Sequence, residues 1–162
     1  MADSTFDLVS DFDQQELVNA LDQVRREVAT RFDFKNAKVS IELGKAEITL
    51  HADDEFRASA VKDLIQSKAV RRGLSLKIFE WGPLQPAAGG KVRQQIGLKR
   101  GLSADQAKEL SKLIRERFPK LKPQIQGDAV RVSGKSRDEL QAVIAHFKGM
   151  DYPVALQFTN YR

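Results

Sequence analysis

The sequence predicts an α+β fold built from two tandem β-α-β-β-α-β units. One order of strand and helix patterns occurs twice, each copy contains a hairpin signal between its helices, and a Gly- and Pro-rich stretch at 82–90 separates the copies. The length of 162 residues suits one ordinary domain or two very small ones. With 41% hydrophobic and 30% charged residues, the chain has the composition of a globular protein with a buried core.

The first copy begins with an alternating pattern at 6–10, which predicts a short strand, followed by a helix that Asp13 opens. Asp13 and Glu16 have the spacing of a capping box. The helix carries apolar residues at intervals of three and four, namely Leu17, Leu21, Val24, Val28 and Phe32. Because these positions share one side of a helix, the stripe is expected to face a core.

Two alternating runs around Gly44-Lys45 come next, and this two-residue Gly-X turn predicts a β-hairpin. Asp53 or Asp54 caps a second helix, because either side chain can accept hydrogen bonds from the first free amides. A last strand is predicted at 76–80.

The second copy repeats this order. It has a strand pattern at 92–99, a helix at 103–118 and a hairpin around residues 127–128, where the turn is again of the Gly-X type. Ser136 then opens a helix, and a final strand is predicted at 154–159.

This repeated order is typical of ferredoxin-like domains, and two of them in tandem is the economical interpretation. We expect the first domain at 1–81, a linker at 82–90 and the second domain at 91–162. In each domain the helices can cover only one face of the sheet, so alternate strand positions face outward.

The net charge of +5 is divided unevenly along the chain. Residues 1–90 carry 12 Lys/Arg and 15 Asp/Glu, whereas residues 91–162 carry 15 and 7, so the two parts have net charges of −3 and +8. A local excess of positive charge attracts polyanions, which makes nucleotides and nucleic acids the first partners to consider. A solvated basic face is the alternative interpretation.

Several kinds of chemistry lack the residues that they need. The chain has no cysteine, its two histidines stand without ligand spacing, and no serine lies in a nucleophile elbow. No stretch approaches the length of a membrane span, and the N-terminus has no signal-peptide pattern. We therefore expect a cytoplasmic protein that is not an enzyme, has no metal or cofactor, and does not associate with membranes.

Residues 129–136 match a relaxed phosphate-loop pattern. Val130 and Val132 alternate as a strand, however, and a strand cannot also form the open nest of amides that a phosphate loop needs. What remains is an anion site at a helix N-terminus, where free amides and the helix dipole favour negative charge beside Lys135 and Arg137. An ordinary helix cap explains the same residues equally well.

Contacts to phosphates are expected from two groups of cations near helix starts, Arg93, Lys99 and Arg100 in one group and Arg131, Lys135 and Arg137 in the other. The RNA-recognition module shares this order of elements, but it stacks bases on aromatic residues of its third strand. Neither 47–51 nor 129–133 contains an aromatic residue, so base stacking on such a sheet is disfavoured.

Segments along nearly the whole chain resemble the YajQ family of small bacterial proteins. They are FDLVS at 6–10, RFDFK at 31–35, GKVRQ at 90–94, QIQGD at 124–128, VRVSGKSRD at 130–138 and QFTNYR at 157–162. The resemblance implies two ferredoxin-like domains with exchanged N-terminal strands. The strand at 5–10 would join the second sheet, and the strand at 92–99 would join the first.

The resemblance also implies a function, which is nucleotide binding without enzyme activity, with cyclic di-GMP as the expected ligand. Such an effector would act through a protein or nucleic-acid partner, for example a transcription regulator. An RNA-associated protein, with transfer RNA as one partner and only incidental nucleotide affinity, is the main alternative, and a scaffold without a small ligand is a third.

A cyclic dinucleotide has two phosphates and two guanines, so its site needs cations or helix amides together with flat or amide-bearing groups. We expect Arg131, Lys135 and Arg137 to contact phosphate. Base contacts are expected from Gln126 and Gln157 at base edges and from Phe34 by stacking, and a cleft near Lys35 and Lys99 is the alternative location.

Overall fold

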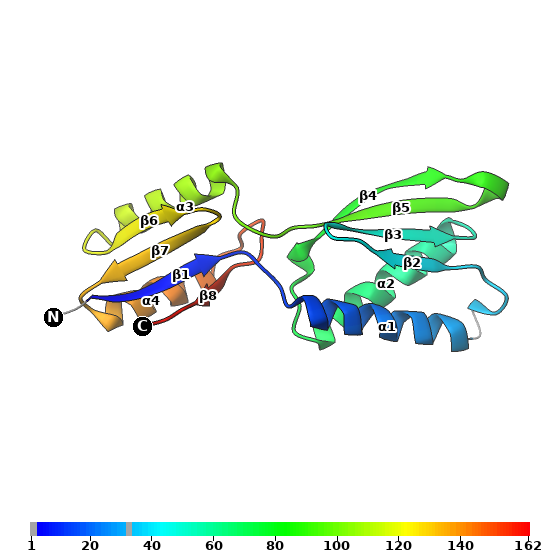
Figure 1. The fold of residues 1–162 in the computed structure, drawn as a ribbon, viewed down its shortest axis with the longest axis horizontal. Helices are drawn as coiled ribbons and strands as arrows, with labels where there is room; N and C mark the ends of the chain where they lie inside the picture. Colours follow the sequence, from blue (N-terminus) through cyan, green and yellow to red (C-terminus); the bar gives the residue numbers. More distant parts are fainter. Residues whose placement is uncertain (1–2, 32–33) are drawn as a thin grey trace. The chain divides into compact units, whose positions relative to one another are not determined.

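A computed structural model describes residues 3–31 and 34–162 (Figure 1). In that part of the chain, eight strands form two four-stranded antiparallel sheets, and four α-helices accompany them. The fold is α+β and consists of two tandem ferredoxin-like β-α-β-β-α-β units, which confirms the predicted fold class.

The elements follow the predicted order. The helices are α1 (Gln14–Thr30), α2 (Glu55–Arg71), α3 (Ala104–Arg117) and α4 (Arg137–Lys148). The strands are β1 (Ser4–Val9), β2 (Ser40–Leu43), β3 (Glu47–Ala52), β4 (Phe79–Pro86), β5 (Val92–Leu98), β6 (Lys122–Gln126), β7 (Ala129–Gly134) and β8 (Gln157–Thr159).

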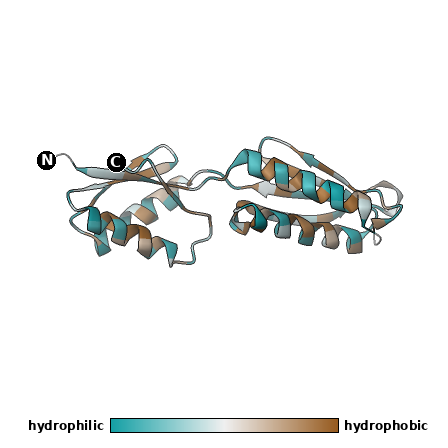
Figure 2. Ribbon diagram, turned by 90° about the horizontal axis from the view of Figure 1, so that it is seen from below, coloured by the Kyte–Doolittle hydropathy of each residue, from teal (hydrophilic) through white to brown (hydrophobic). Residues whose placement is uncertain are grey.

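Each α-helix begins at a side chain that accepts hydrogen bonds from free amides of the first turn. Asp13, Asp54, Ser103 and Ser136 take this part in α1 to α4. Among the described helices, α3 has the complete capping box: the Gln106 amide donates to the Ser103 hydroxyl at 3.1 Å, and the Ser103 amide donates to Gln106 Oε1 at 3.0 Å. The hydropathy colouring shows polar and apolar residues alternating around the helices (Figure 2), as amphipathic helices on a sheet require.

The strand order of the sheets is β6-β7-β1-β8 and β2-β3-β5-β4. The first strand of the chain, β1, therefore lies between β7 and β8 (Figure 1), and β5 lies between β3 and β4. Each sheet thus contains a strand that the order of the sequence would place in the other sheet. This is the pairing that exchanged N-terminal strands produce.

The chain contacts define two compact units. Unit 1 consists of the residues up to Asp11 together with Arg100–Arg162, and unit 2 consists of Phe12–Lys99. Unit 2 is continuous in sequence and is inserted into unit 1. At the insertion point the Gly101 amide donates a 2.6 Å hydrogen bond to the Ser10 carbonyl, and an ion pair of 2.8 Å joins Arg100 to Asp11.

The core of unit 1 lies between one face of its sheet and the helices α3 and α4. Phe6 and Leu8 of β1 face the same core as their cross-strand partners Val132 and Val130. Leu110, Ile114, Leu140, Val143 and Phe147 cover these residues from the two helices. Because side chains alternate along a strand, Asp7 and Arg131 lie on the opposite, open face.

Unit 2 is built in the same way. Ile48 and Leu50 of β3 are fully buried, as are Leu17, Leu21 and Val24 of α1 and Val61 and Ile65 of α2. Ile96 of the exchanged strand β5 pairs with Ile48 and completes this core. Both helices lie on one side of the sheet (Figure 1).

Three local predictions differ from the structure. The first hairpin was expected to turn at Gly44-Lys45, but Leu43 pairs with Ile48 and the Gly44 amide bonds to the Glu47 carbonyl, so the turn lies at 45–46. This register places Ile48 in the core. The strand expected at 76–80 begins as a 3-10 helix, Leu76–Ile78. The final strand is limited to β8 (Gln157–Thr159), although it was expected from 154.

Residues 82–90, where the Pro and Gly content predicted a linker, lie in a hairpin of unit 2. Residues up to Pro86 belong to β4, and Ala88–Gly90 form a short turn before β5. The Pro and Gly residues are compatible with this hairpin because β4 is an edge strand, where a missing amide donor breaks no ladder on its outer side.

The strand exchange also redistributes charge. Unit 1 carries 12 Lys/Arg and 10 Asp/Glu, and unit 2 carries 15 and 12, so their net charges are +2 and +3. The contrast of −3 and +8 in the linear sequence disappears because β1 and its flanks bring three aspartates to unit 1. The residues 91–99 bring three cations to unit 2.

Candidate functional site

Unit 1 contains a pocket of about 590 Å³ beside the first turn of α4. Three lysines line it, Lys120, Lys122 and Lys135. The remaining lining residues are Asp3, Gly134, Ser136 and Glu139. We call this set the lysine pocket. Within residues 3–31 and 34–162, none of the three lysines forms an ion pair, so their charges remain available to an anion.

Local structure explains how these lysines meet. Lys122 pairs with Ser133 in the β6–β7 ladder, so the start of β6 lies beside the end of β7. Lys135 follows β7 directly, and Ser136 then caps α4 by accepting a 3.3 Å hydrogen bond from the Glu139 amide. The hairpin thus places two cationic segments at a helix N-terminus, where the helix dipole also favours an anion.

Arg131 lies near the middle of the open face of unit 1 and is bound to a carboxylate. Its Nε and Nη2 donate to the two oxygens of Asp7 at 2.9 and 3.3 Å, and Asn160 Nδ2 donates to Asp7 Oδ2 at 2.8 Å. Asp7 is only 8% exposed, whereas the Arg131 side chain is 44% exposed. The outer side of the guanidinium therefore remains accessible, but much of its charge is balanced.

The hydrogen bond from Arg131 is the main reason why the pKa of Asp7 lies below its ordinary value. Desolvation of the carboxyl group opposes this shift, while the hydrogen bond from Asn160 and the charges of Arg131 and Arg162 favour it. Asp7 is therefore ionised at neutral pH and remains a partner for Arg131.

The other predicted residues of unit 1 are spread along its sheet. Arg137 is exposed in the first turn of α4, next to the lysine pocket but not among its lining residues. Gln126 pairs with Ala129 at the hairpin end of β6, about 17 Å along the strand from Gly134 at ~3.3 Å per residue. Gln157 lies at that same end, and its Oε1 accepts a 2.7 Å hydrogen bond from the Asp11 amide.

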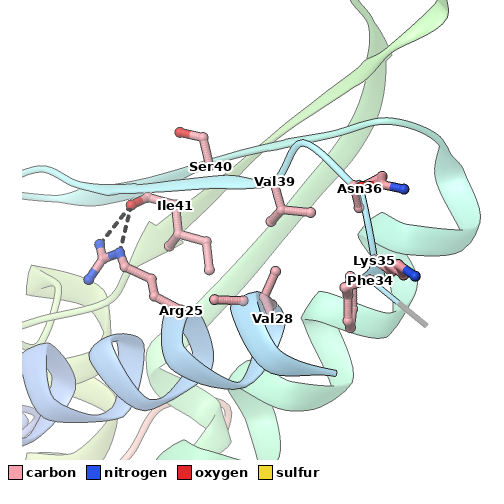
Figure 3. Close-up of a pocket in the computed structure, with 10 residues that line it drawn as sticks. Arg25, Val28, Phe34, Lys35, Asn36, Val39, Ser40 and Ile41 are labelled. Atoms are coloured by element: carbon pink, nitrogen blue, oxygen red, sulfur yellow. Dashed lines mark hydrogen bonds between the residues drawn. The ribbon is translucent and has the colours of Figure 1, made fainter. Parts of the chain in front are cut away.

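The remaining predicted residues, Phe34, Lys35 and Lys99, lie in unit 2. Phe34 is 3% exposed, and Lys99 follows β5, where its amide donates a 2.8 Å hydrogen bond to the Ile78 carbonyl. Phe34 and Lys35 line a second pocket of about 620 Å³ between α1 and β2 (Figure 3). Asp33 and Phe32, the neighbours quoted with them, lie outside the described residues.

We call this second pocket the valine pocket, because Val28 and Val39 face each other across it (Figure 3). Its other lining residues are Arg25, Ala29, Phe34, Lys35, Asn36, Ala37, Ser40 and Ile41. Arg25 closes one end by donating from Nη2 and Nε to the Ile41 carbonyl at 2.6 and 3.2 Å.

Lys120, Lys122 and Asp7 were not among the residues that the sequence patterns predicted for the site. Lys122, Gln124 and Gln126 are alternate residues of β6 and face the same side of the sheet. The alternating pattern that pointed to Gln126 therefore also includes Lys122. Asp7 had no comparable signal, because its partner Arg131 is 124 residues away.

Two further observations limit the chemistry of the molecule. Among the residues that the structure describes, no group of three or more His, Asp or Glu side chains is placed to hold a metal ion. No helix in this part of the chain is long and apolar enough to cross a membrane.

Comparison with known proteins gives a consistent result over the whole chain. The family model described as "Nucleotide-binding protein YajQ-like" matches residues 4–162. A protein from Roseiflexus castenholzii is 58% identical over 163 residues, with 99% of both chains covered, and one from Thermosynechococcus vestitus is 55% identical over 158 residues, with 98% of this chain and 97% of the relative covered. A protein from Nostoc is 54% identical over 158 residues with the same coverage.

Each of these relatives is named as a nucleotide-binding protein, and none of their names describes an enzyme. The match to the family model extends over both units, and the relatives share more than half of their residues with this chain over nearly its full length. The chain therefore belongs to the YajQ-like family of nucleotide-binding proteins.

Proposed function

We propose that this protein binds a nucleotide without catalysis and that the lysine pocket holds the phosphates. The observation that carries the proposal is the meeting of Lys120, Lys122 and Lys135 in one pocket at the N-terminus of α4. Phosphate oxygens accept hydrogen bonds from ammonium groups and helix amides, and several such donors in one pocket are what a phosphate needs. The names of the relatives support nucleotide binding as the function.

The ligand that we propose is cyclic di-GMP, because the neighbouring surface suits the rest of such a molecule. Lys122 belongs both to the lysine pocket and to the open face of the sheet, where Gln124 and Arg131 occupy the next paired positions. Side-chain amides and guanidinium groups recognise base edges by hydrogen bonds. A ligand with its phosphate in the pocket would therefore extend its guanines over polar residues on the sheet face opposite α3 and α4.

In this proposal Lys135 is a direct phosphate ligand, and Arg137 and Arg131 are supporting cations. Gln126 and Gln157 contribute only to a ligand that reaches the far end of the sheet. Phe34, Lys35 and Lys99 belong to unit 2 and take no part in this site. In this proposal the protein performs no reaction itself. The bound nucleotide would therefore act by changing how the protein binds a partner, for example a transcription regulator.

The test is a calorimetric titration with cyclic di-GMP, GTP and ATP. In the double variant Lys122→Gln and Lys135→Gln, affinity should fall at least about tenfold, which corresponds to ~1.4 kcal/mol. The matched control is Lys108→Gln with Lys148→Gln, which removes the same charge from exposed positions of unit 1 outside the pocket. Equal losses from the two variants would contradict the proposed site, and a protein that binds none of the three nucleotides would contradict the function.

RNA binding is the second candidate, and the open face of unit 1 favours it. Lys122 and Arg131 lie on the sheet face opposite the one that α3 and α4 cover, and Lys122 lines the same pocket as Lys135. Binding of transfer RNA would release counterions, so its affinity should fall steeply between about 50 and 200 mM salt, whereas a nucleotide held in a pocket depends on salt less. Tight transfer RNA binding with a steep salt dependence and weak nucleotide binding would favour this candidate.

A further inference from the structure

The valine pocket of unit 2 leaves apolar surface uncovered at the end of a core. The apolar stripe of α1 is fully buried at Leu17, Leu21 and Val24, but its next member, Val28, is only half-buried. Val28 faces Val39 across the pocket (Figure 3). Ala29, Ala37 and Ile41 add to this apolar lining. A volume of about 620 Å³ lies within the range of small-molecule sites.

The two ends of the pocket differ in the charge that they offer. At one end, Arg25 is already engaged, since it donates to the Ile41 carbonyl and forms a 2.9 Å ion pair with Asp22. At the other end lie Lys35 and Asn36, both exposed. Within the described residues, the Lys35 ammonium has no ion-pair partner, and no carboxylate lines the pocket.

The segment that carries Lys35 is held in place by hydrogen bonds. The Ala37 amide donates to the Phe34 carbonyl at 2.9 Å, and the Lys38 amide donates to Asp53 Oδ2 at 2.8 Å. Asn36 has a positive φ of 61°, which fits the tight turn between Phe34 and Ala37. These bonds hold the backbone of residues 34–38, while the flexible stem of Lys35 can reorient its ammonium group.

We propose that the valine pocket binds a small organic anion that has an apolar, preferably aromatic, body and one carboxylate. The apolar body lies between Val28 and Val39, and the carboxylate lies at the Lys35 end, where the ammonium and the Asn36 amide donate hydrogen bonds. Charge complementarity supports an anion, because the described residues that line the pocket include two cations and no carboxylate. This site is independent of nucleotide binding, which we place in unit 1.

The experiment is a methyl NMR titration of the full-length protein with naphthoate as the probe. Saturable shifts are expected at the methyl groups of Val28, Ala29 and Val39, with no shift at Val143 in the core of unit 1. Naphthalenemethanol has the same apolar body without the charge and should bind at least about fivefold more weakly. Unshifted pocket methyls at about 5 mM naphthoate, or equal affinity for the alcohol, would overturn the proposal.

Two variants locate the contacts. Lys35→Gln should weaken naphthoate binding about fivefold, whereas Lys45→Gln, an exposed lysine of the same unit, should not change it. Ala29→Phe should fill the pocket from the exposed side of α1 and abolish binding, and its unfolding transition verifies that the chain still folds. Equal effects of the two lysine variants would overturn the assignment, as would tighter binding of GMP than of naphthoate at the same methyl groups.

Discussion

The Asp7 carboxylate joins three parts of unit 1 that are distant in sequence. It lies on β1, accepts hydrogen bonds from Arg131 of β7 and from Asn160 after β8, and is almost completely buried. Removal of Arg131 would leave a buried carboxylate without its main donor, which is costly for stability. A variant of Arg131 therefore tests folding as well as ligand binding, and the lysines of the pocket are the better test of the site.

We predict that Asp7→Asn lowers the free energy of unfolding by about 1–2 kcal/mol at neutral pH, because the charged hydrogen bonds to Arg131 are lost. The folded-state pKa of Asp7 is lowered, so the stabilisation is present above its ordinary pKa of 3.8 and is lost as the pH falls through the lower, folded value. Urea denaturation of both proteins between about pH 3 and pH 7 measures the effect.

The dependence of unfolding stability on pH below about pH 4 is the most direct test of this prediction. The stability of the variant should decline less steeply than that of the wild type below about pH 4. Asp11→Asn is the control, since the Asp11 ion pair with Arg100 is about half-exposed and should contribute less than ~1 kcal/mol. Parallel pH profiles for the wild type and Asp7→Asn would show that the carboxylate does not have this role.

At the scale of elements, the β4–β5 hairpin shows how one glycine permits an irregular pairing. The register shifts between Trp81 and Leu84, and Gly82 lies within this irregularity. The Gly82 carbonyl accepts a 2.7 Å hydrogen bond from Gln94 Nε2, whose side chain is buried on the helix side of β5. The hairpin therefore depends on a close approach of two backbones.

We predict that Gly82→Ala destabilises the protein by about 1–3 kcal/mol, because an added Cβ would lie 2.7 Å from the Gln95 carbonyl oxygen. This oxygen belongs to the backbone and cannot rotate away. Gly97→Ala is the matched control in the neighbouring strand, where the nearest atom to a new Cβ is 3.5 Å away. Thermal unfolding compares them, and equal transition temperatures of the two variants would contradict the prediction.

At the scale of the whole molecule, the insertion of unit 2 into unit 1 determines which pieces of the chain form complete sheets. All four strands of the second sheet, β2 to β5, occur within residues 12–99. The first sheet needs β1, which lies in its interior between β7 and β8. Deletion of β1 would therefore break the sheet in the middle rather than expose an edge.

We predict that residues 12–99 fold as an isolated fragment, whereas residues 91–162, the domain expected from sequence order, do not. The second fragment lacks β1, so β8 has no neighbour and the buried Phe6 and Leu8 are missing from its core. Cooperative urea transitions and dispersed amide NMR signals measure the outcome. A cooperative transition in fragment 91–162, or its absence in fragment 12–99, would contradict the prediction.

A joined variant tests the same architecture from the other side. Replacing residues 12–99 by a short Gly/Ser linker should give a folded unit 1, because Ser10 and Gly101 are already within hydrogen-bond distance. We expect this variant to unfold cooperatively and to retain nucleotide binding if the lysine pocket is the site. If the joined variant folds but does not bind the nucleotide as the intact protein does, the predicted architecture is supported and the lysine pocket is contradicted as the site.

The local elements could be predicted from the residue pattern alone: the caps at Asp13 and Ser103, the apolar stripes, the 127–128 turn and hence the β-α-β-β-α-β order. These depend on contacts between residues close in sequence. The local patterns do not show which sheet β1 and β5 join; the family resemblance implied the exchange, and the sheet order shows it. The pairing of Asp7 with Arg131 and the meeting of Lys120, Lys122 and Lys135 emerge from the tertiary structure. A strand with this alternating pattern could pair in either sheet. Which sheet it joins depends on packing between residues that are distant in sequence, and the periodicity of the sequence does not reveal that packing.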